Sequence, residues 1–153
     1  MQRIIHSLKY ENNFRVGEIL GRMLGHKLLN DIKSPSPDLI LPVPLHHLKK
    51  SERGYNQSFY ISKGVNKILN LALNDKSAKR IKYTETQTSM NIKERERNIA
   101  GAFQVRSSKS IAGKNILIID DVITSGNTVS EFGRILKKNG AGTIYAASLA
   151  IAD

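Results

Sequence analysis

Two adjacent carboxylates lie between an apolar run and a loop of small residues, in the part of the sequence best suited to chemistry. Asp120 and Asp121 follow the apolar residues 116–119, whose composition favours a strand buried on both faces of a parallel sheet. Residues 124–128 are small and include Gly126, so the main chain there can approach a ligand closely. The pattern indicates a sugar-phosphate site, in which the acids bind sugar hydroxyls or a divalent cation shared with a phosphate.

The small-residue loop is predicted to lead directly into a helix. Thr128 and Glu131 have the spacing of a capping box, and Val129, Phe132 and Leu136 follow at helical intervals. Free N–H groups and the positive end of the helix dipole favour a phosphate at such a terminus. Because ligands of α/β sheets bind beyond the carboxyl ends of the strands, we expect the acids and this helix terminus to form one site.

The order of apolar strand, Asp-Asp and Thr-Ser-Gly-Asn-Thr resembles the phosphoribosyl pyrophosphate (PRPP) motif of the type I phosphoribosyltransferases. The resemblance implies that Asp120 and Asp121 hold the ribose hydroxyls and meet Mg²⁺ only indirectly, through magnesium-bound PRPP. It implies transfer of phosphoribose from PRPP to a nucleobase or amine, with release of pyrophosphate. The implied 5′-phosphate ligands are Thr124, Ser125, Gly126, Asn127 and Thr128.

Further segments narrow the resemblance to the ComF group of competence-associated phosphoribosyltransferase-like proteins, over about residues 4–152. They are residues 41–46 (LPVPLH), residues 53–57 (RGYNQ), Thr84, Gln87, Arg95, Asn98 and residues 101–103 (GAF). Many members begin with a cysteine-rich zinc module, and this sequence has no cysteine, so we expect the module to be absent or to precede the sequence. The resemblance leaves a second function open, that of a non-catalytic competence protein which binds PRPP and handles single-stranded DNA during natural transformation.

Two other segments are expected to contact the pyrophosphate. The loop after a strand at residues 38–43 leaves the same sheet edge as the acids; in the family the pyrophosphate loop lies here, around Leu45 and His46. Arg53 is a third candidate, and it lies one turn before Gln57 if the following helix begins by Gly54; an ordinary surface loop is the alternative. Residues 84–90 lack periodicity and are predicted to be mobile. The basic segment after them supplies Arg95 as the catalytic cation that closes over the ligand.

Composition and charge restrict the partners and the location. The 153 residues carry 24 Lys and Arg against 13 Asp and Glu, a net charge of +11, so the preferred partner should be anionic. PRPP fits, and single-stranded DNA on a basic face is the further candidate. No apolar run is long enough to span a bilayer, and residues 1–6 do not resemble a secretory signal, from which we expect a cytoplasmic location. The acceptor and the oligomeric state stay open.

Strand and helix patterns alternate along the chain and predict one α/β domain over residues 1–153. The expected architecture is a mostly parallel sheet flanked by helices, which the resemblance specifies as the type I phosphoribosyltransferase fold with a small N-terminal hood. A helix at residues 14–30 is predicted to pack on the sheet through an apolar stripe that includes Ile19 and Met23. The remaining expected elements are a helix at 58–69, a weak edge strand at 80–83 and strands at 103–105 and 143–149.

Overall fold

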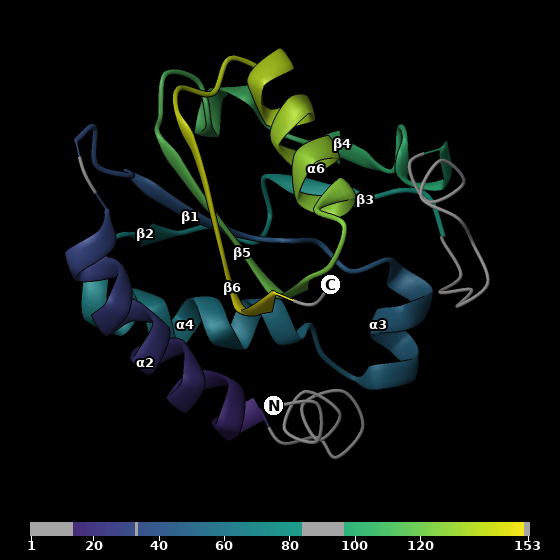
Figure 1. Ribbon diagram of the computed structural model, residues 1–153. Coiled ribbons are helices and arrows are strands. Elements are labelled where there is room, and N and C mark those ends of the chain that lie inside the picture. The colour runs from purple at the N-terminus through teal and green to yellow at the C-terminus, as the bar shows by residue number, and fades with distance from the viewer. Residues whose placement is uncertain (1–13, 33, 84–96, 152–153) are drawn as a thin grey trace.

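A four-stranded parallel sheet forms the centre of the molecule. The computed structural model describes residues 14–32, 34–83 and 97–151. The strands run in the order β2 (Ala72–Leu73), β1 (Leu39–Pro42), β5 (Ile116–Ile123) and β6 (Ile144–Ile151), and each neighbouring pair is parallel (Figure 1). The predicted parallel α/β architecture is confirmed.

Helices cover both faces of the sheet (Figure 1). The helices α2 (Phe14–Asp31) and α4 (Gln57–Leu69) lie on one face, and α6 (Asn127–Lys138) lies on the other. Because strand side chains alternate between faces, Leu39 and Leu41 pack in the cluster containing α6, whereas Ile40 packs with α4. No helix in the described ranges combines the length and apolar content needed to cross a membrane.

A small antiparallel pair adds to the α6 side of the sheet. It consists of β3 (Ala78–Arg80) and β4 (Phe103–Val105), and the short 3-10 helix η1 (Ser108–Ser110) follows. The pair is anchored by Phe103, whose ring centroid lies 4.9 Å from that of Phe132 in α6. The strand expected at 80–83 was misplaced, because β3 ends at Arg80 and residues 81–83 lie outside it. Arg95, the loop at residues 84–90 and residues 1–13, which belong to the N-terminal segment expected to form the hood, lie outside the described residues.

The contact between α2 and α4 is made by glycines. Gly21 is buried in α2, and a Cβ atom there would overlap the carbonyl oxygen of Ile61; Gly64 in α4 faces the backbone of α2 in the same way. The predicted apolar stripe of α2 is therefore wrong in part, because Ile19 and Met23 are 58% and 65% exposed. The two backbones approach too closely for larger side chains to lie between them.

Candidate sugar-phosphate site

Asp120 and Asp121 lie inside a strand and not beyond its end. The prediction ended the strand at Ile119, but β6 continues alongside β5, with Asp120 opposite Ser148 and Val122 opposite Ala150. The ladder extends β5 to Ile123 because β6 supplies partners for its last residues. Asp120 is consequently held by sheet pairing at the C-terminal part of β5, and Asp121 lies between the paired residues Asp120 and Val122.

Asp120 is held by two hydrogen bonds to one carboxylate oxygen. Ser58, in the first turn of α4, donates its hydroxyl to Asp120 Oδ1 at 3.0 Å, and the Asp121 main-chain N–H donates to the same oxygen at 2.9 Å. Burial, followed by the neighbouring Asp121 carboxylate, raises the pKa of Asp120 to about 7. A carboxyl that titrates near neutrality and carries a second acid beside it is typical of a functional site.

Asp120 should make the stability of the protein depend on pH. In the unfolded chain its pKa is near 3.8, so the folded state binds more protons between about pH 4 and pH 7, and stability falls as pH rises through this range. Asp120→Asn lacks this proton and keeps an oxygen acceptor for Ser58. Urea unfolding measures the difference in free energy of unfolding between this variant and the unsubstituted protein. We expect that difference to shift in favour of the variant by about 2 kcal/mol between pH 5 and pH 8. The exposed control Asp31→Asn should show no such shift, and an equal shift in both variants would contradict the assignment.

The loop after β5 ends in a helix N-terminus that has no side-chain cap. Gly126 is the N-cap residue of α6, with a φ of 76° that favours glycine. The predicted capping box is wrong: Thr128 lies within α6, and Glu131 instead accepts hydrogen bonds from the Gly101 N–H at 2.8 Å and from Arg134. The first N–H groups of α6 thus have no side-chain acceptor at the cap, the condition that suits an anion.

Two side-chain amides close to these elements are buried donors. Asn127 begins α6 and Gln57 begins α4, next to Ser58. Within the described residues, Asn127 Nδ2 and Gln57 Nε2 are buried and have no hydrogen-bond acceptor. Because an unsatisfied buried donor costs roughly 1–3 kcal/mol, both amides favour a ligand that brings oxygen acceptors.

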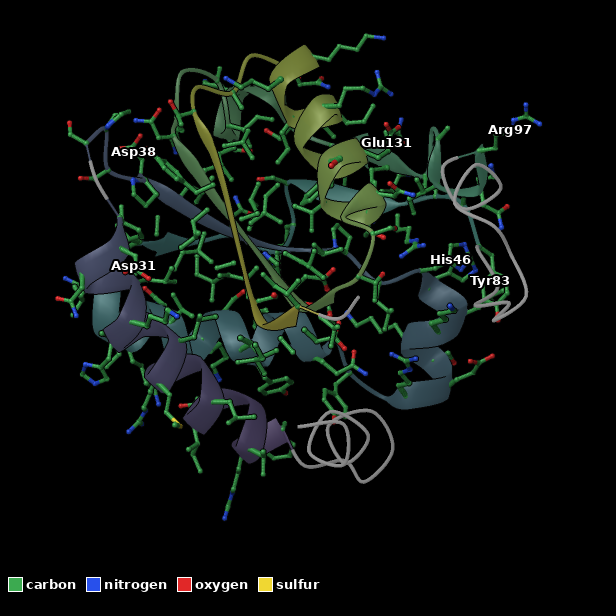
Figure 2. The ribbon with its side chains drawn as sticks, in the orientation of Figure 1. Asp31, Asp38, His46, Tyr83, Arg97 and Glu131 are labelled. Atoms are coloured by element: carbon green, nitrogen blue, oxygen red, sulfur yellow. The ribbon has the colours of Figure 1, made fainter. Side chains whose placement is uncertain are left out.

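The segment expected to be a pyrophosphate loop contains a short helix, α3 (His47–Arg53). His46 is its N-cap residue and accepts from the Leu48 N–H at 3.4 Å through Nδ1. Figure 2 shows His46 beside Tyr83, with ring centroids 5.3 Å apart. Burial, followed by the charge of His47, lowers the pKa of His46, so its imidazole is neutral at pH 7. Whether Leu45 and His46 contact a pyrophosphate stays a prediction.

Arg53 and Gln57 do not share a helix, so that expectation was wrong. Arg53 ends α3, Gly54 follows with a φ of 77°, and Asn56 caps α4 through the Ser58 N–H at 3.1 Å. The chain turns between the two helices because Gly54 adopts the left-handed conformation. Arg53 is therefore positioned by α3, and Gln57 by α4.

Two residues near the acids were not selected from the sequence. Ser58 is 62 positions from Asp120, so only the packing of α4 against β5 brings them together. Arg80 lies in β3, where burial lowers its pKa and the charge of Asp120 opposes that effect. Basic and apolar residues alternate over residues 80–83, which indicated a strand. Nothing in the sequence predicted that Arg80 lies near the acids.

The match to a family model decides what this arrangement is. Residues 56–152 match the model of the phosphoribosyl transferase domain, and they include Ser58, both acids and the whole of α6. The chain belongs to the phosphoribosyl transferase domain family. The predicted type I phosphoribosyltransferase fold is confirmed by solved structures as well. One is the purine phosphoribosyltransferase from Pyrococcus horikoshii, at 17% identity, with a TM-score of 0.52 over 88% of this chain and 72% of that one.

Curated relatives confirm the resemblance of this phosphoribosyl transferase domain to the ComF group. It is 33% identical to Competence protein F of Haemophilus influenzae over 96% of this chain and 66% of the relative. It is also 33% identical to the DNA utilization protein YhgH of Salmonella typhi, over 92% of this chain and 63% of the relative. The chain thus spans just under two thirds of the length of these relatives.

The donor set at the acids fits a magnesium ion that arrives with its ligand. Among the residues that the structure describes, no cluster of three or more His, Cys, Asp or Glu side chains could hold a metal. Asp120 and Asp121 offer carboxylate oxygens, and Mg²⁺ is commonly bound by one or two carboxylates together with substrate phosphates and water. Asp120 and Asp121 would therefore suit a magnesium ion that is carried by a phosphorylated ligand and reaches the acids only through that ligand.

Proposed function

We propose that the protein binds PRPP with Mg²⁺ at Asp120, Asp121 and the N-terminus of α6, and transfers phosphoribose to a nucleobase or amine with release of pyrophosphate. The observation that carries the proposal is the position of Asp120, which is held by Ser58 and lies six residues before Gly126, the N-cap residue of α6. Carboxylates accept hydrogen bonds from vicinal hydroxyls, whereas a helix N-terminus donates to a phosphate. One ligand that carries both groups is a phosphorylated pentose.

Each part of the site has a distinct task in this proposal. Asp120 and Asp121 orient the ribose through its hydroxyls, and residues 124–128 hold the 5′-phosphate with main-chain N–H groups and the Asn127 amide. Magnesium, when bound, neutralises negative charge on the departing pyrophosphate. Cations such as Arg53 and Arg95 are proposed to stabilise the same charge.

Titration of the protein with PRPP and MgCl₂ tests the binding step. The ribose hydroxyls donate to an ionised carboxylate, so binding should release a proton wherever Asp120 is protonated in the free protein. With the Asp120 pKa near 7, we expect affinity to rise several-fold from pH 6 to pH 8. Calorimetry at pH 6.5 in two buffers of different ionisation enthalpy should detect the proton release. Absence of binding at millimolar PRPP, or binding with no proton release, would oppose the proposal.

A second function, a non-catalytic protein that binds PRPP and handles single-stranded DNA, is favoured by two observations. First, two relatives of this chain are named for competence and for DNA utilization. Second, the net charge of the chain is +11, which exceeds what a nucleotide-sized ligand requires. Pyrophosphate release separates the two functions. If PRPP binds but no nucleobase or amine from a broad panel releases pyrophosphate, the non-catalytic function is supported and the transferase is not.

A further inference from the structure

A closed ring of hydrogen bonds joins the N-terminus of α4 to the ends of β1 and β5. The Asn56 side chain donates through Nδ2 to the Val43 carbonyl oxygen at 3.0 Å, and the Val43 N–H donates to the Ile119 carbonyl oxygen at 2.9 Å. Ile119 is bonded covalently to Asp120, whose Oδ1 accepts from the Ser58 hydroxyl at 3.0 Å. The Ser58 N–H closes the ring by donating to Asn56 Oδ1 at 3.1 Å. The ring therefore fixes three elements to one another.

The hydrogen-bonded ring connects the two parts of the proposed PRPP site. Asp120 belongs to the acid pair that is proposed to hold the ribose. Val43 directly precedes residues 44–46, which contain the predicted pyrophosphate contacts. Val43 and Ser58 are each 5% exposed, so their hydrogen bonds are shielded from water and are stronger than the same bonds in solvent. The position of the pyrophosphate segment relative to the acids is therefore set in part by this ring.

Asn56 uses both ends of its amide in the ring. Its oxygen caps α4, a role that serine or aspartate fills about equally well. Its nitrogen donates to Val43 at the same time, which the acceptor-only carboxylate of aspartate cannot do and which the short hydroxyl of serine cannot reach. Capping of α4 alone therefore does not account for the hydrogen bond to Val43.

We propose that Asn56 is a positioning residue, which holds the pyrophosphate segment at the spacing from Asp120 and Asp121 that PRPP spans. The proposal rests on the proposed function and on the predicted contact of Leu45 and His46 with pyrophosphate. A ligand that reaches both parts gains from a fixed spacing, because less freedom is lost when it binds. Ribose 5-phosphate lacks the pyrophosphate, so it meets only the acids and the phosphate loop and gains nothing from this spacing.

Asn56→Ser separates positioning from capping. Serine keeps an uncharged acceptor at the N-cap of α4 and removes the donor to Val43. Calorimetric titration with PRPP and MgCl₂ gives the affinity for PRPP, and competition with PRPP gives that for ribose 5-phosphate. The PRPP affinity should fall about tenfold, whereas the ribose 5-phosphate affinity should stay within about twofold of that of the unsubstituted protein.

Asn139→Ser is the matched control. Asn139 also uses both ends of its amide, since Nδ2 donates to the Ile135 carbonyl oxygen at 2.9 Å and Oδ1 accepts from the Ser108 hydroxyl at 3.0 Å. It lies at the C-terminal end of α6, opposite the end proposed to bind phosphate, so both ligands should bind within about twofold of the unsubstituted protein. Thermal melting confirms that each variant is folded at the temperature of the titration.

Ser58→Ala opens the same ring at a different bond. Once Asn56→Ser has opened the ring, a second opening removes less, because residues in one hydrogen-bond network are not independent. The double variant Asn56→Ser with Ser58→Ala should therefore lose less PRPP affinity than the product of the two separate losses. A loss equal to that product would show that Asn56 and Ser58 act separately, which contradicts the ring.

The remaining outcomes distinguish this proposal from the proposed function. Equal losses for PRPP and ribose 5-phosphate in Asn56→Ser would show a purely structural role, and unchanged PRPP binding would show that Asn56 does not set the spacing. Either result overturns the proposal and leaves the proposed function intact. Failure of ribose 5-phosphate to compete with PRPP in the unsubstituted protein also overturns it, because the ribose is then not held separately. If the unsubstituted protein binds no PRPP, the proposed function fails, and this proposal fails with it.

Discussion

Gly64→Ala is expected to lower the melting temperature by roughly 5–15 °C. An alanine Cβ at this position would overlap the carbonyl oxygen of Glu18 and lie 2.7 Å from the Arg22 nitrogen and 2.8 Å from the Gly21 carbonyl carbon. These are main-chain atoms of α2, so the clash is relieved only if the two helices separate. Alanine stabilises a helix by about 1 kcal/mol relative to glycine. The melting temperature falls only if the free-energy cost of the steric overlap is larger than this gain. Thermal unfolding followed by circular dichroism measures the effect.

Gly133→Ala is the matched control for this substitution. Gly133 is also buried inside a helix, but a Cβ there would meet Ile144 Cγ2 at 3.4 Å and Ile118 Cδ1 at 3.8 Å, ordinary contact distances. It should therefore leave the melting temperature unchanged or raise it by a few degrees. If Gly64→Ala melts no lower than Gly133→Ala, the close approach of α2 and α4 is wrong.

Asp120→Asn with Asp121→Asn is expected to weaken PRPP binding at least about 100-fold. Each carboxylate accepts hydrogen bonds without donating, and an amide presents N–H groups to hydroxyl and phosphate oxygens in its place. Hydrogen bonds to charged groups contribute about 1.5–3 kcal/mol each, so the loss of two corresponds to a factor of 100 or more. Calorimetric titration with PRPP and MgCl₂ at pH 8 gives the dissociation constants.

The sign of this effect separates two explanations of the site. If the site bound PRPP only through attraction between positive charge and phosphate, removing two negative charges would tighten PRPP binding. Asp31→Asn with Asp75→Asn makes the same change in net charge at two exposed residues outside β5, and it should leave the affinity nearly unchanged. Unchanged or tighter binding in the Asp120 and Asp121 variant would refute the assignment of the acids to the ribose.

The sequence predicted the sheet and the acid pair because both depend on local patterns. The apolar run at residues 116–119 could only be a buried strand, and Asp120 and Asp121 follow it directly. The helix at residues 14–30 was also predicted at nearly the correct position, but its buried face was not predicted correctly. The prediction relied on the spacing of hydrophobic residues, and glycine does not contribute to that pattern. Gly17, Gly21 and Gly25 recur every four residues, and this spacing was the signal for a close helix contact.

The errors occurred where tertiary packing determines the local structure. Glu131 matched a capping box, yet its carboxylate is used by Arg134 and the Gly101 N–H. Arg53 was assigned to the wrong helix because the turn at Gly54 depends on how α3 and α4 are packed. The Ser58 hydroxyl in α4 donates to Asp120 in β5, and periodicity within one segment carries no information about a contact between two elements.

The position of the acids within a paired strand has a consequence for the thermodynamics of ligand binding. Sheet pairing continues past them to Ile123, so folding itself has already restricted their main chain. Ordering a residue costs roughly 1–2 kcal/mol in conformational entropy, and a ligand that meets Asp120 and Asp121 does not incur this cost. Among residues 120–128, Thr124 and Ser125 are exposed beyond the strand, so within this segment such a loss on binding falls on them and not on the acids.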